Sequence, residues 1–340
     1  MTSLPDRPRL QDIALAAGVS EATVSRVVNR RAGVAPATRR KVLQALRATG
    51  YAPRGPERDE RSPLVGMIVP ELDNPVFPAF AQAIESRLAS RNLTTVLGTS
   101  TPAGMSEAQY VDVLLDHGVS GIVVVSGAAA DINGDHGHYA ALREAGVPLV
   151  AVNGRAPGLD VPVVNADIRG AARRTVRHLV DLGHRRIGLA VGPLRYVPSR
   201  QCLEGFGTGL RDARMTPDDD LVAVTVFGVE GGHSAAVHLI AREVTAIVCA
   251  SDLMAIGAIR AAREESLSVP DELSVVGYDD AGFGAWTAPP LTSMRQPIGA
   301  MSDAVVALLI DAMNRRRVDV DDLRFPTELI VRGSTGPVHA

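Results

Sequence analysis

The side chains best placed to contact a partner lie on one short segment near the N-terminus. The segment from Ser20 to Asn29 reads SEATVSRVVN, and at helical spacing Glu21, Ala22 and Arg26 point away from its valines. In the major groove of DNA, Arg26 can bond guanine N7 and O6, Ala22 can touch a thymine methyl group, and Glu21 can accept from a cytosine amino group. The spacing therefore predicts a helix that reads base pairs.

Other polar side chains around this helix suit the DNA backbone. Hydroxyl, amide and guanidinium groups that bond phosphate oxygens fix the register of a protein on the duplex without reading sequence. The residues assigned to this role are Thr23, Ser25, Asn29, Arg30 and Thr38.

Three short helical patterns position these groups: Leu10 to Ala17, Ser20 to Asn29 and Pro36 to Thr49. Between the first two, Gly18 can take the positive φ of a tight turn and Ser20 can cap the following helix. This is the chemistry of a helix-turn-helix; a three-helix protein-interaction module is the alternative. The predicted common core comprises Ile13, Ala14, Ala17, Val24, Val27, Val42, Leu43 and Leu46.

Charge is unevenly distributed along the 340 residues. Residues 1–55 hold ten Arg and Lys against three Asp and Glu, a net charge of +7 within a total of −3, so the remainder carries −10. A basic head on an acidic body favours a head that meets phosphate, although a solvated basic face would have the same composition.

From residue 64 onward, apolar β-rich runs alternate with amphipathic helical stretches, and the alternation restarts after Ile168. This predicts an α/β body of two lobes, each with a doubly wound parallel sheet. Ligands of such sheets bind beyond the carboxyl ends of the strands, where polar side chains suit a polyhydroxylated ligand and loop capping is the alternative role. The residues expected at these ends are Asp73, Phe77, Ser100, Ser126, Asn153, Ser251, Asp252 and Asp279.

The segment RLQDIALAAGVSEATVSRVVNRRAGVAPATRRKVLQALRATGYAPR resembles the headpiece of the lac-repressor (LacI/GalR) family. The body segments LDNPVF, HLVDLGHRRIGLAVGP, TAIVCASDLMAIGAIRAA, VPDELSVVGYDD and PPLTSMRQP resemble the same family's landmarks. The resemblance implies a DNA-binding repressor with a periplasmic-binding-protein-like body that binds a sugar or sugar derivative. It places Glu21, Ala22 and Arg26 at base-reading positions, and it places at effector-contacting positions Phe77, Ser100, Asn153, Asp167, Asp252 and Asp279.

The sequence departs from the family pattern at several places. Cys202 stands where the family has an arginine three residues before Gly205, and Arg200 lies nearby on the same predicted helix, so we include Arg200 among the effector candidates. Asn153 replaces a common aspartate. Arg9 and Ala35 stand where the family has helix-capping hydroxyls, a loss of about 1 kcal/mol for each cap.

These features predict a head in residues 1–55, a linker in 56–63 and an effector-binding and dimerisation body in 64–340. The linker carries charged residues where the family has an apolar wedge, which predicts an irregular tether or a polar hinge.

The working hypothesis is a cytoplasmic homodimer, or higher homo-oligomer, on a pseudo-palindromic operator in double-stranded DNA. We expect no cofactor, metal, membrane contact or catalysis. A solute-binding protein of a sugar transport system and an enzyme on the same scaffold are the alternatives.

Overall fold

The computed structural model describes residues 10–28, 34–35, 38, 41–42, 45–46, 49, 62–101, 103–316 and 322–338. The chain forms two compact units, residues 1–61 and 62–340. Apart from Ser62 and Pro63, the predicted linker lies outside the described residues, as do Arg9, Asn29 and Arg30.

The head begins with α1 (Leu10–Ala17) and α2 (Glu21–Val28), joined by the predicted turn. Gly18 adopts φ +65°, which only glycine takes without strain, and the Val19 N–H closes the turn on the Ala14 carbonyl at 3.0 Å. The Ser20 hydroxyl accepts from the backbone N–H of Thr23 at 3.3 Å. The predicted turn and cap are therefore both confirmed.

A small apolar cluster holds the head together. Ile13 and Ala14 of α1 pack with Val24 and Val27 of α2, and further along the chain with Val42, Ala45 and Leu46. This confirms most of the predicted core; Leu43 lies outside the described residues.

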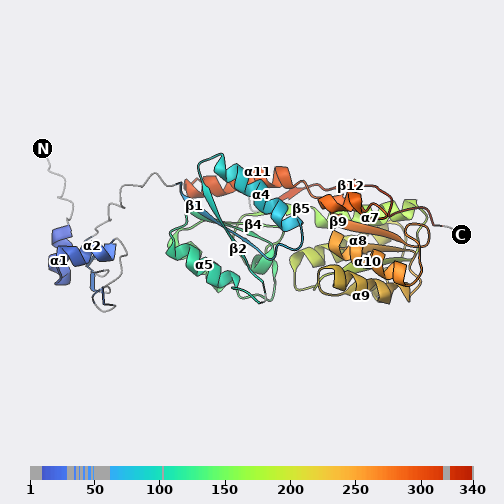
Figure 1. Cartoon of the computed structure of the whole chain (residues 1–340), viewed down its shortest axis with the longest axis horizontal. Helices are drawn as coiled ribbons and strands as arrows, with labels where there is room; N and C mark the ends of the chain where they lie inside the picture. The colour runs from blue at the N-terminus through green and yellow to red at the C-terminus, as the bar shows by residue number, and fades with distance from the viewer. Residues whose placement is uncertain are drawn as a thin grey trace. The chain divides into compact units, whose positions relative to one another are not determined.

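The first lobe of the body is built on a six-stranded parallel sheet in the order β11-β5-β4-β3-β1-β2. Its strands are β1 (Leu64–Val69), β2 (Thr94–Thr99), β3 (Gly121–Val125), β4 (Leu149–Val152), β5 (Val163–Ala166) and β11 (Asp322–Phe325). Helices α4 (Val76–Ala89) and α11 (Ile298–Met313) cover one face, and α5 (Glu107–Asp116) and α6 (Gly137–Ala145) cover the other (Figure 1). The short helix η1 (Gly127–Ala130) follows β3.

The second lobe has the sheet order β12-β10-β9-β8-β6-β7, in which only β12 runs antiparallel to its neighbour. Its strands are β6 (Ile187–Val191), β7 (Val222–Val224), β8 (Ala246–Cys249), β9 (Ser274–Asp279), β10 (Thr292–Arg295) and β12 (Glu328–Ile330). Helices α7 (Ile168–Asp181) and α8 (Val197–Asp212) pack on one face, and α9 (Val229–Ile240) and α10 (Asp252–Glu264) on the other. The short helices are η2 (Asp219–Leu221) and η3 (Gly282–Trp286). The expected two-lobed, doubly wound fold is confirmed.

The chain does not stay in the second lobe after Ile168, as the restart of the pattern suggested. Helix α11 packs against α4, and β11 pairs with β5, so both belong to the first lobe, and the chain crosses between the lobes three times. Strands β5, β10, β11 and β12 were not predicted. Each has only three or four residues, and DLRF and ELI place charged residues within a strand, which hides the apolar pattern.

Glycines let the helix pairs of the second lobe approach closely. Gly205 and Gly209 both lie within α8, and a Cβ on Gly205 would meet the Arg169 carbonyl of α7 at 2.2 Å. Across the sheet, a Cβ on Gly257 of α10 would meet the Val229 carbonyl of α9 at 2.0 Å. Both contacts are with backbone, which cannot rotate away.

Gly257→Ala should therefore lower the free energy of unfolding by about 1 to 3 kcal/mol, because an overpacked backbone contact can be relieved only by moving a helix. Urea denaturation followed by circular dichroism measures the change. Gly282→Ala is the matched control, since nothing lies within 4 Å of its added Cβ. Equal midpoints for the two variants would contradict the packing argument.

Candidate functional site

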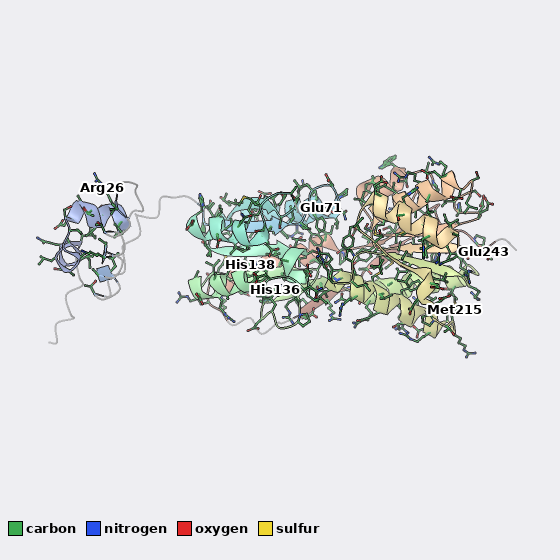
Figure 2. The ribbon with its side chains drawn as sticks, turned by 90° about the horizontal axis from the view of Figure 1, so that it is seen from below. Arg26, Glu71, His136, His138, Met215 and Glu243 are labelled. Carbon is green, nitrogen blue, oxygen red and sulfur yellow. The ribbon has the colours of Figure 1, made fainter. Side chains whose placement is uncertain are left out.

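The exposed face of α2 has the geometry needed to enter a groove of DNA. Val24 and Val27 are 0% and 5% exposed, whereas Glu21 and Ala22 are exposed, as is Arg26 (Figure 2). The Arg26 side chain therefore faces solvent rather than the apolar core of the head. Thr23, Ser25 and Thr38 are partly exposed, and Ala35 is exposed.

A second site lies in the body, where the carboxyl ends of both sheets face one another. These ends enclose a cavity of about 620 Å³, which we call the interlobe cavity. Its volume lies within the range of about 300 to 1,000 Å³ typical of small-molecule sites. It is lined by Pro70, Glu71, Asn74, Val76, Phe77, Phe80, Ser100, Thr101, Gly104, Ser106, Gln109, Ser126, Gly127, Ala128, Ala130, Asp131, Asn153, Ile168, Tyr196, Pro198, Phe227, Ala250, Ser251, Tyr278, Asp279 and Gln296.

The structure brings together five of the eight candidate effector residues. Phe77, Ser100, Ser126, Asn153 and Asp279 all line the interlobe cavity, each at or just beyond the end of a strand or at the start of the helix that follows. Asp167, Arg200 and Asp252 do not line it.

Asp167 and Arg200 are engaged elsewhere. The Asp167 carboxylate caps α7 by accepting from the Gly170 N–H at 2.9 Å. Arg200 is exposed on α8, and its Nε donates to the Leu194 carbonyl at 2.8 Å. Arg200 therefore does not replace the arginine that the family has at the position of Cys202.

Asp252 is buried immediately behind the cavity rather than in its wall. One carboxylate oxygen accepts from the Ser293 hydroxyl at 2.5 Å and the other from the Ala281 N–H at 2.7 Å. The residue thus ties the start of α10 to β10 and to the loop that follows Asp279.

A chain of hydrogen bonds forms the floor of the interlobe cavity and links the lobes. The Asn153 Nδ2 donates to Gln296 Oε1 at 2.8 Å, and Gln296 Nε2 donates to Asp279 Oδ1 at 2.6 Å. Asn74 of the first lobe also hydrogen-bonds the Asp279 carboxyl group. Asn153 and Asp279 both hold positive φ, at +54° and +115°, a strained backbone that the surrounding bonds sustain.

Two buried acids stand at this floor with raised pKa values. Burial raises the pKa of Asp252 to about 7, although its bonds from Ser293 and Ala281 act in the opposite direction. Burial also raises the pKa of Asp279 well above its usual value, the neighbouring Asp252 adds to the rise, and the bond from Gln296 opposes it. Proton uptake at this floor is therefore easier than at an exposed carboxylate.

A buried network in the first lobe shapes the wall formed by η1. Glu107 accepts from the Ala128 N–H at 2.9 Å and from the Tyr139 hydroxyl, and His138 Nε2 lies 3.3 Å from the same carboxylate. His136 Nε2 contacts the Ala128 carbonyl at 2.9 Å. The two histidines (Figure 2) thus lie at the start of α6 and contact protein groups of this wall.

Direct contacts join the lobes beside this wall. The Ile132 N–H donates to the Arg195 carbonyl at 2.9 Å, and the Arg195 guanidinium lies 3.3 Å from the Asp131 carboxylate. Next to Arg195, the rings of Tyr196 and Phe227 meet at 5.9 Å between centroids. An aromatic face is therefore built at the cavity's edge.

Sequence reasoning missed several lining residues: some lie one or two positions from residues that it chose, one follows β10, which it did not predict, and others lie in loops or helices farther from the strand ends. They include Glu71, Asn74, Gln109, Asp131, Tyr196, Phe227, Tyr278 and Gln296. Phe227 closes the apolar run LVAVTVF, so its position past the end of β7 was the available signal.

The sequence is similar to known proteins along nearly its whole length. The sequence matches the family described as "Bacterial regulatory proteins, lacI family" over residues 9–54 and that described as "Periplasmic binding protein-like domain" over residues 176–335. It is 50% identical to an HTH-type transcriptional regulator in the aml 5' region of Streptomyces limosus, over 97% of this chain and 95% of that protein. It is 47% identical to the HTH-type transcriptional regulator MalR of Streptomyces coelicolor, over 96% of each chain.

Two solved structures share the fold over nearly the whole length. The transcriptional regulator CelR in complex with cellobiose matches with a TM-score of 0.74 and 32% identity, over 96% of this chain and all of that one. The lac repressor dimer bound to operator and an anti-inducer matches with a TM-score of 0.71 and 28% identity, over 97% of this chain and all of that one.

A helix-turn-helix head on a two-lobed, cavity-bearing body is the architecture of a DNA-binding regulator. The chain belongs to the lacI family of bacterial regulatory proteins and is a sequence-specific transcription regulator. Among the helices that the structure describes, none combines the length and apolar character needed to span a bilayer.

The raised pKa of Asp252 predicts a pH-dependent stability. The pKa of an aspartate is 3.8 in its ordinary state, and burial raises the pKa of Asp252 in the folded protein to about 7. The contribution of the protonated Asp252 to the free energy of unfolding is therefore fully present below pH 3.8 and is lost as the pH rises through 7.

The free energy of unfolding of the unaltered protein should fall, relative to that of Asp252→Asn, between about pH 4 and pH 7. Urea denaturation at half-unit pH intervals measures this difference. Asp219→Asn, which removes an exposed acid in η2, is the control for loss of one negative charge. A constant difference between the unaltered protein and Asp252→Asn across this range would show that the carboxyl is not perturbed.

Proposed function

We propose that the interlobe cavity binds a neutral carbohydrate and that its occupancy changes the affinity of the head for operator DNA. The observation that carries the ligand class is the charge of the cavity wall. Among the described lining residues the ionisable acids are Glu71, Asp131 and Asp279, and none is Lys or Arg. A phosphate or carboxylate group would find no Lys or Arg side chain in the described lining to balance its charge.

The remaining lining suits a sugar ring. The side chains of Asn74, Gln109, Asn153 and Gln296 supply both donors and acceptors, which can bond several hydroxyl groups at once. The aromatic rings of Phe77, Tyr196 and Phe227 supply apolar surface for the faces of the ring. The similarity to the CelR–cellobiose complex supports this class of ligand.

The hydrogen-bonded floor provides a route from the ligand to the lobes. Gln296 lies in the segment that crosses from β10 to α11, and its side chain bonds both Asn153 and Asp279. A ligand that bonds Asn153 and Asp279 competes with these bonds. Ligand binding then favours one lobe arrangement over another. A differential affinity of about 1 to 3 kcal/mol suffices for a five- to 150-fold change in operator binding.

On DNA, we propose that Glu21, Ala22 and Arg26 read base edges and that Thr23, Ser25, Asn29, Arg30 and Thr38 contact the backbone. A homodimer or higher homo-oligomer would place two heads on the half-sites of a pseudo-palindromic operator. The similarity to the operator-bound lac repressor dimer supports this arrangement. We assign residues 1–55 to the head, 56–63 to the linker and 64–340 to the body.

Within this proposal the protein acts as a repressor, binds and releases its ligand without chemical change, and works in the cytoplasm because its DNA is there. A solute-binding protein of a transport system would share the body but would have no use for the helix-turn-helix head.

Neutral mono- and disaccharides should raise the melting temperature, whereas their phosphorylated forms should not. A ligand at a hundredfold its Kd stabilises the native state by about 2.7 kcal/mol. A thermal-shift screen of sugar and sugar-phosphate pairs measures this. Asp279→Ala should abolish the shift while DNA binding persists, and Arg200→Ala, outside the cavity, should keep it. Stabilisation by the phosphates alone would overturn the ligand class.

Arg26→Ala should relax the preference for one base pair of the operator by about 1 to 3 kcal/mol, because a bidentate contact to guanine would be lost. Arg30→Ala should instead weaken binding to all sequences alike. Fluorescence anisotropy on single-base operator variants at fixed salt separates the two. An equal loss on every variant for Arg26→Ala would remove its base-reading role.

A further inference from the structure

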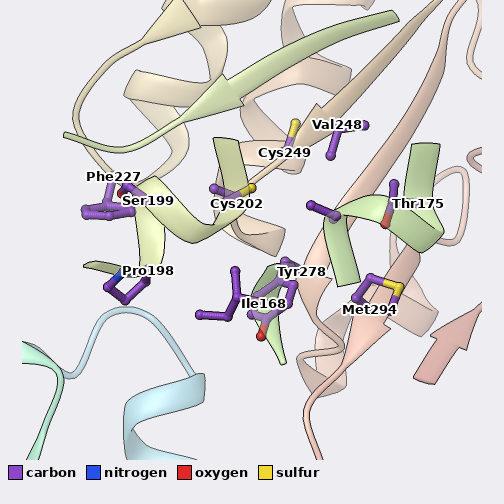
Figure 3. Close-up of a pocket in the computed structure, with 13 residues that line it drawn as sticks. Ile168, Thr175, Pro198, Ser199, Cys202, Phe227, Val248, Cys249, Tyr278 and Met294 are labelled. Atoms are coloured by element: carbon purple, nitrogen blue, oxygen red, sulfur yellow. The ribbon is translucent and has the colours of Figure 1, made fainter. Parts of the chain in front are cut away.

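A second, much smaller cavity adjoins the interlobe cavity within the second lobe (Figure 3). We call this space of about 50 Å³ the annex. The two cavities share part of their walls, formed by Ile168, Pro198, Phe227, Ala250 and Tyr278. The annex is completed by residues of α7, α8, β8, β9 and β10: Ala172, Thr175, Ser199, Cys202, Val248, Cys249, Gly277 and Met294. A ligand in the interlobe cavity therefore has a recess beside it.

Two hydroxyl groups of the annex wall are left without partners. Ser199 is only 2% exposed, and neither its Oγ nor the Tyr278 hydroxyl has a hydrogen-bond partner among the described residues. A buried polar group without a partner costs about 1 to 3 kcal/mol. The two oxygens lie on different sides of the annex in Figure 3, so the nearly fully buried Ser199 hydroxyl is the one that a polar atom entering the annex would complete.

The rest of the annex wall is neutral and largely apolar. Burial raises the pKa of the Cys202 thiol to about 12, so the sulfur carries no charge at neutral pH. Val248 and Met294 add hydrocarbon and thioether surface, and the described residues that line the annex include no Asp, Glu, Lys, Arg or His. A suitable occupant is thus small and uncharged, with carbon to pack against sulfur and a hydroxyl to pair with Ser199.

The size of the recess depends on residue 202. An arginine at this position of α8 would project a long charged side chain toward the cavity, whereas the short thiol of Cys202 leaves the space open. The departure from the family pattern and the annex are therefore one feature.

We infer that the annex receives the hydroxymethyl arm of a neutral hexose unit, so that Cys202 and Ser199 select hexoses over pentoses. This inference rests on the proposed binding of a neutral carbohydrate in the interlobe cavity. The methylene carbon lies against the Cys202 thiol, and the hydroxyl of the arm bonds the unpartnered Ser199 hydroxyl.

The test compares ligands that differ only in this arm. Xylobiose has the linkage of cellobiose and lacks its hydroxymethyl arms. Isothermal titration calorimetry of the full chain with cellobiose, maltose and xylobiose should show tighter binding of at least one glucose disaccharide. Ser199→Ala should weaken that binding by about three- to tenfold, the size of one hydrogen bond, and leave xylobiose binding unchanged.

Cys202→Leu fills the annex and should remove the preference for the glucose disaccharide over xylobiose. Ser302→Ala is the control, because it deletes another buried, unpartnered hydroxyl, on α11 in the first lobe, and should alter neither affinity. Because Ser199 has no partner to lose in the free protein, Ser199→Ala should not lower the melting temperature without ligand.

The outcomes separate the two proposals. If neutral sugars bind, but Ser199→Ala and Cys202→Leu bind hexose and pentose ligands with the same affinities as the unaltered protein, the annex assignment is overturned and the interlobe site stands. A crystal structure with cellobiose or maltose in the interlobe cavity and only water in the annex has the same meaning. If neither glucose disaccharide binds, the hexose assignment fails. If no neutral sugar of the thermal-shift panel binds, the proposed function fails too.

Discussion

Two carboxyl groups buried side by side, those of Asp252 and Asp279, are the constraint around which the body is arranged. A buried acid is tolerated only where hydrogen bonds replace its water, and here Ser293, Ala281 and Gln296 supply them. These donors come from β10, from the loop after β9 and from the segment between β10 and α11, so satisfying the acids fixes three segments at once. The space is fully used, because a Cβ on Gly277 would meet Asp252 Oδ1 at 2.2 Å.

The same constraint makes the cavity responsive. Asp279 bonds residues of both lobes through Asn74 and Gln296, and Asn153 completes the chain on the first lobe. In a low-dielectric floor such bonds are strong when complete and costly when broken. A ligand that exchanges them for its own hydroxyls therefore alters the balance between lobe arrangements with few contacts.

Local patterns predicted the parts of the fold whose residues are neighbours in sequence. The turn at Gly18, the cap by Ser20 and the inward side of Val24 and Val27 follow from spacing alone, and so do the long apolar strands. The return of α11 and β11 to the first lobe did not follow, because pairing of β11 with β5 joins residues more than 150 positions apart. A four-residue strand with charged members has no pattern that specifies its partner.

The candidate site, like the fold, could be predicted only in part from the sequence. Five predicted residues line the interlobe cavity because strand ends converge in any parallel sheet. Asp167 was chosen because the resemblance places it at an effector-contacting position of the family, but a carboxylate there can equally cap the next helix, and the Gly170 N–H decides between these roles. Whether Arg200 faces the cavity depends on the rotation of α8 about its axis. The position of Arg200 two residues before Cys202 does not determine that rotation.

The charges of the residues that line the interlobe cavity also determine which class of ligand it accepts. Since the described lining residues of both lobes include no Lys or Arg, an anionic ligand would find no counter-charge on either wall and could not draw the walls together. A neutral polyol instead gains most when both walls contribute bonds, so its affinity depends on the lobe arrangement. The lack of a counter-charge for phosphorylated sugars is thus consistent with a response to their neutral counterparts.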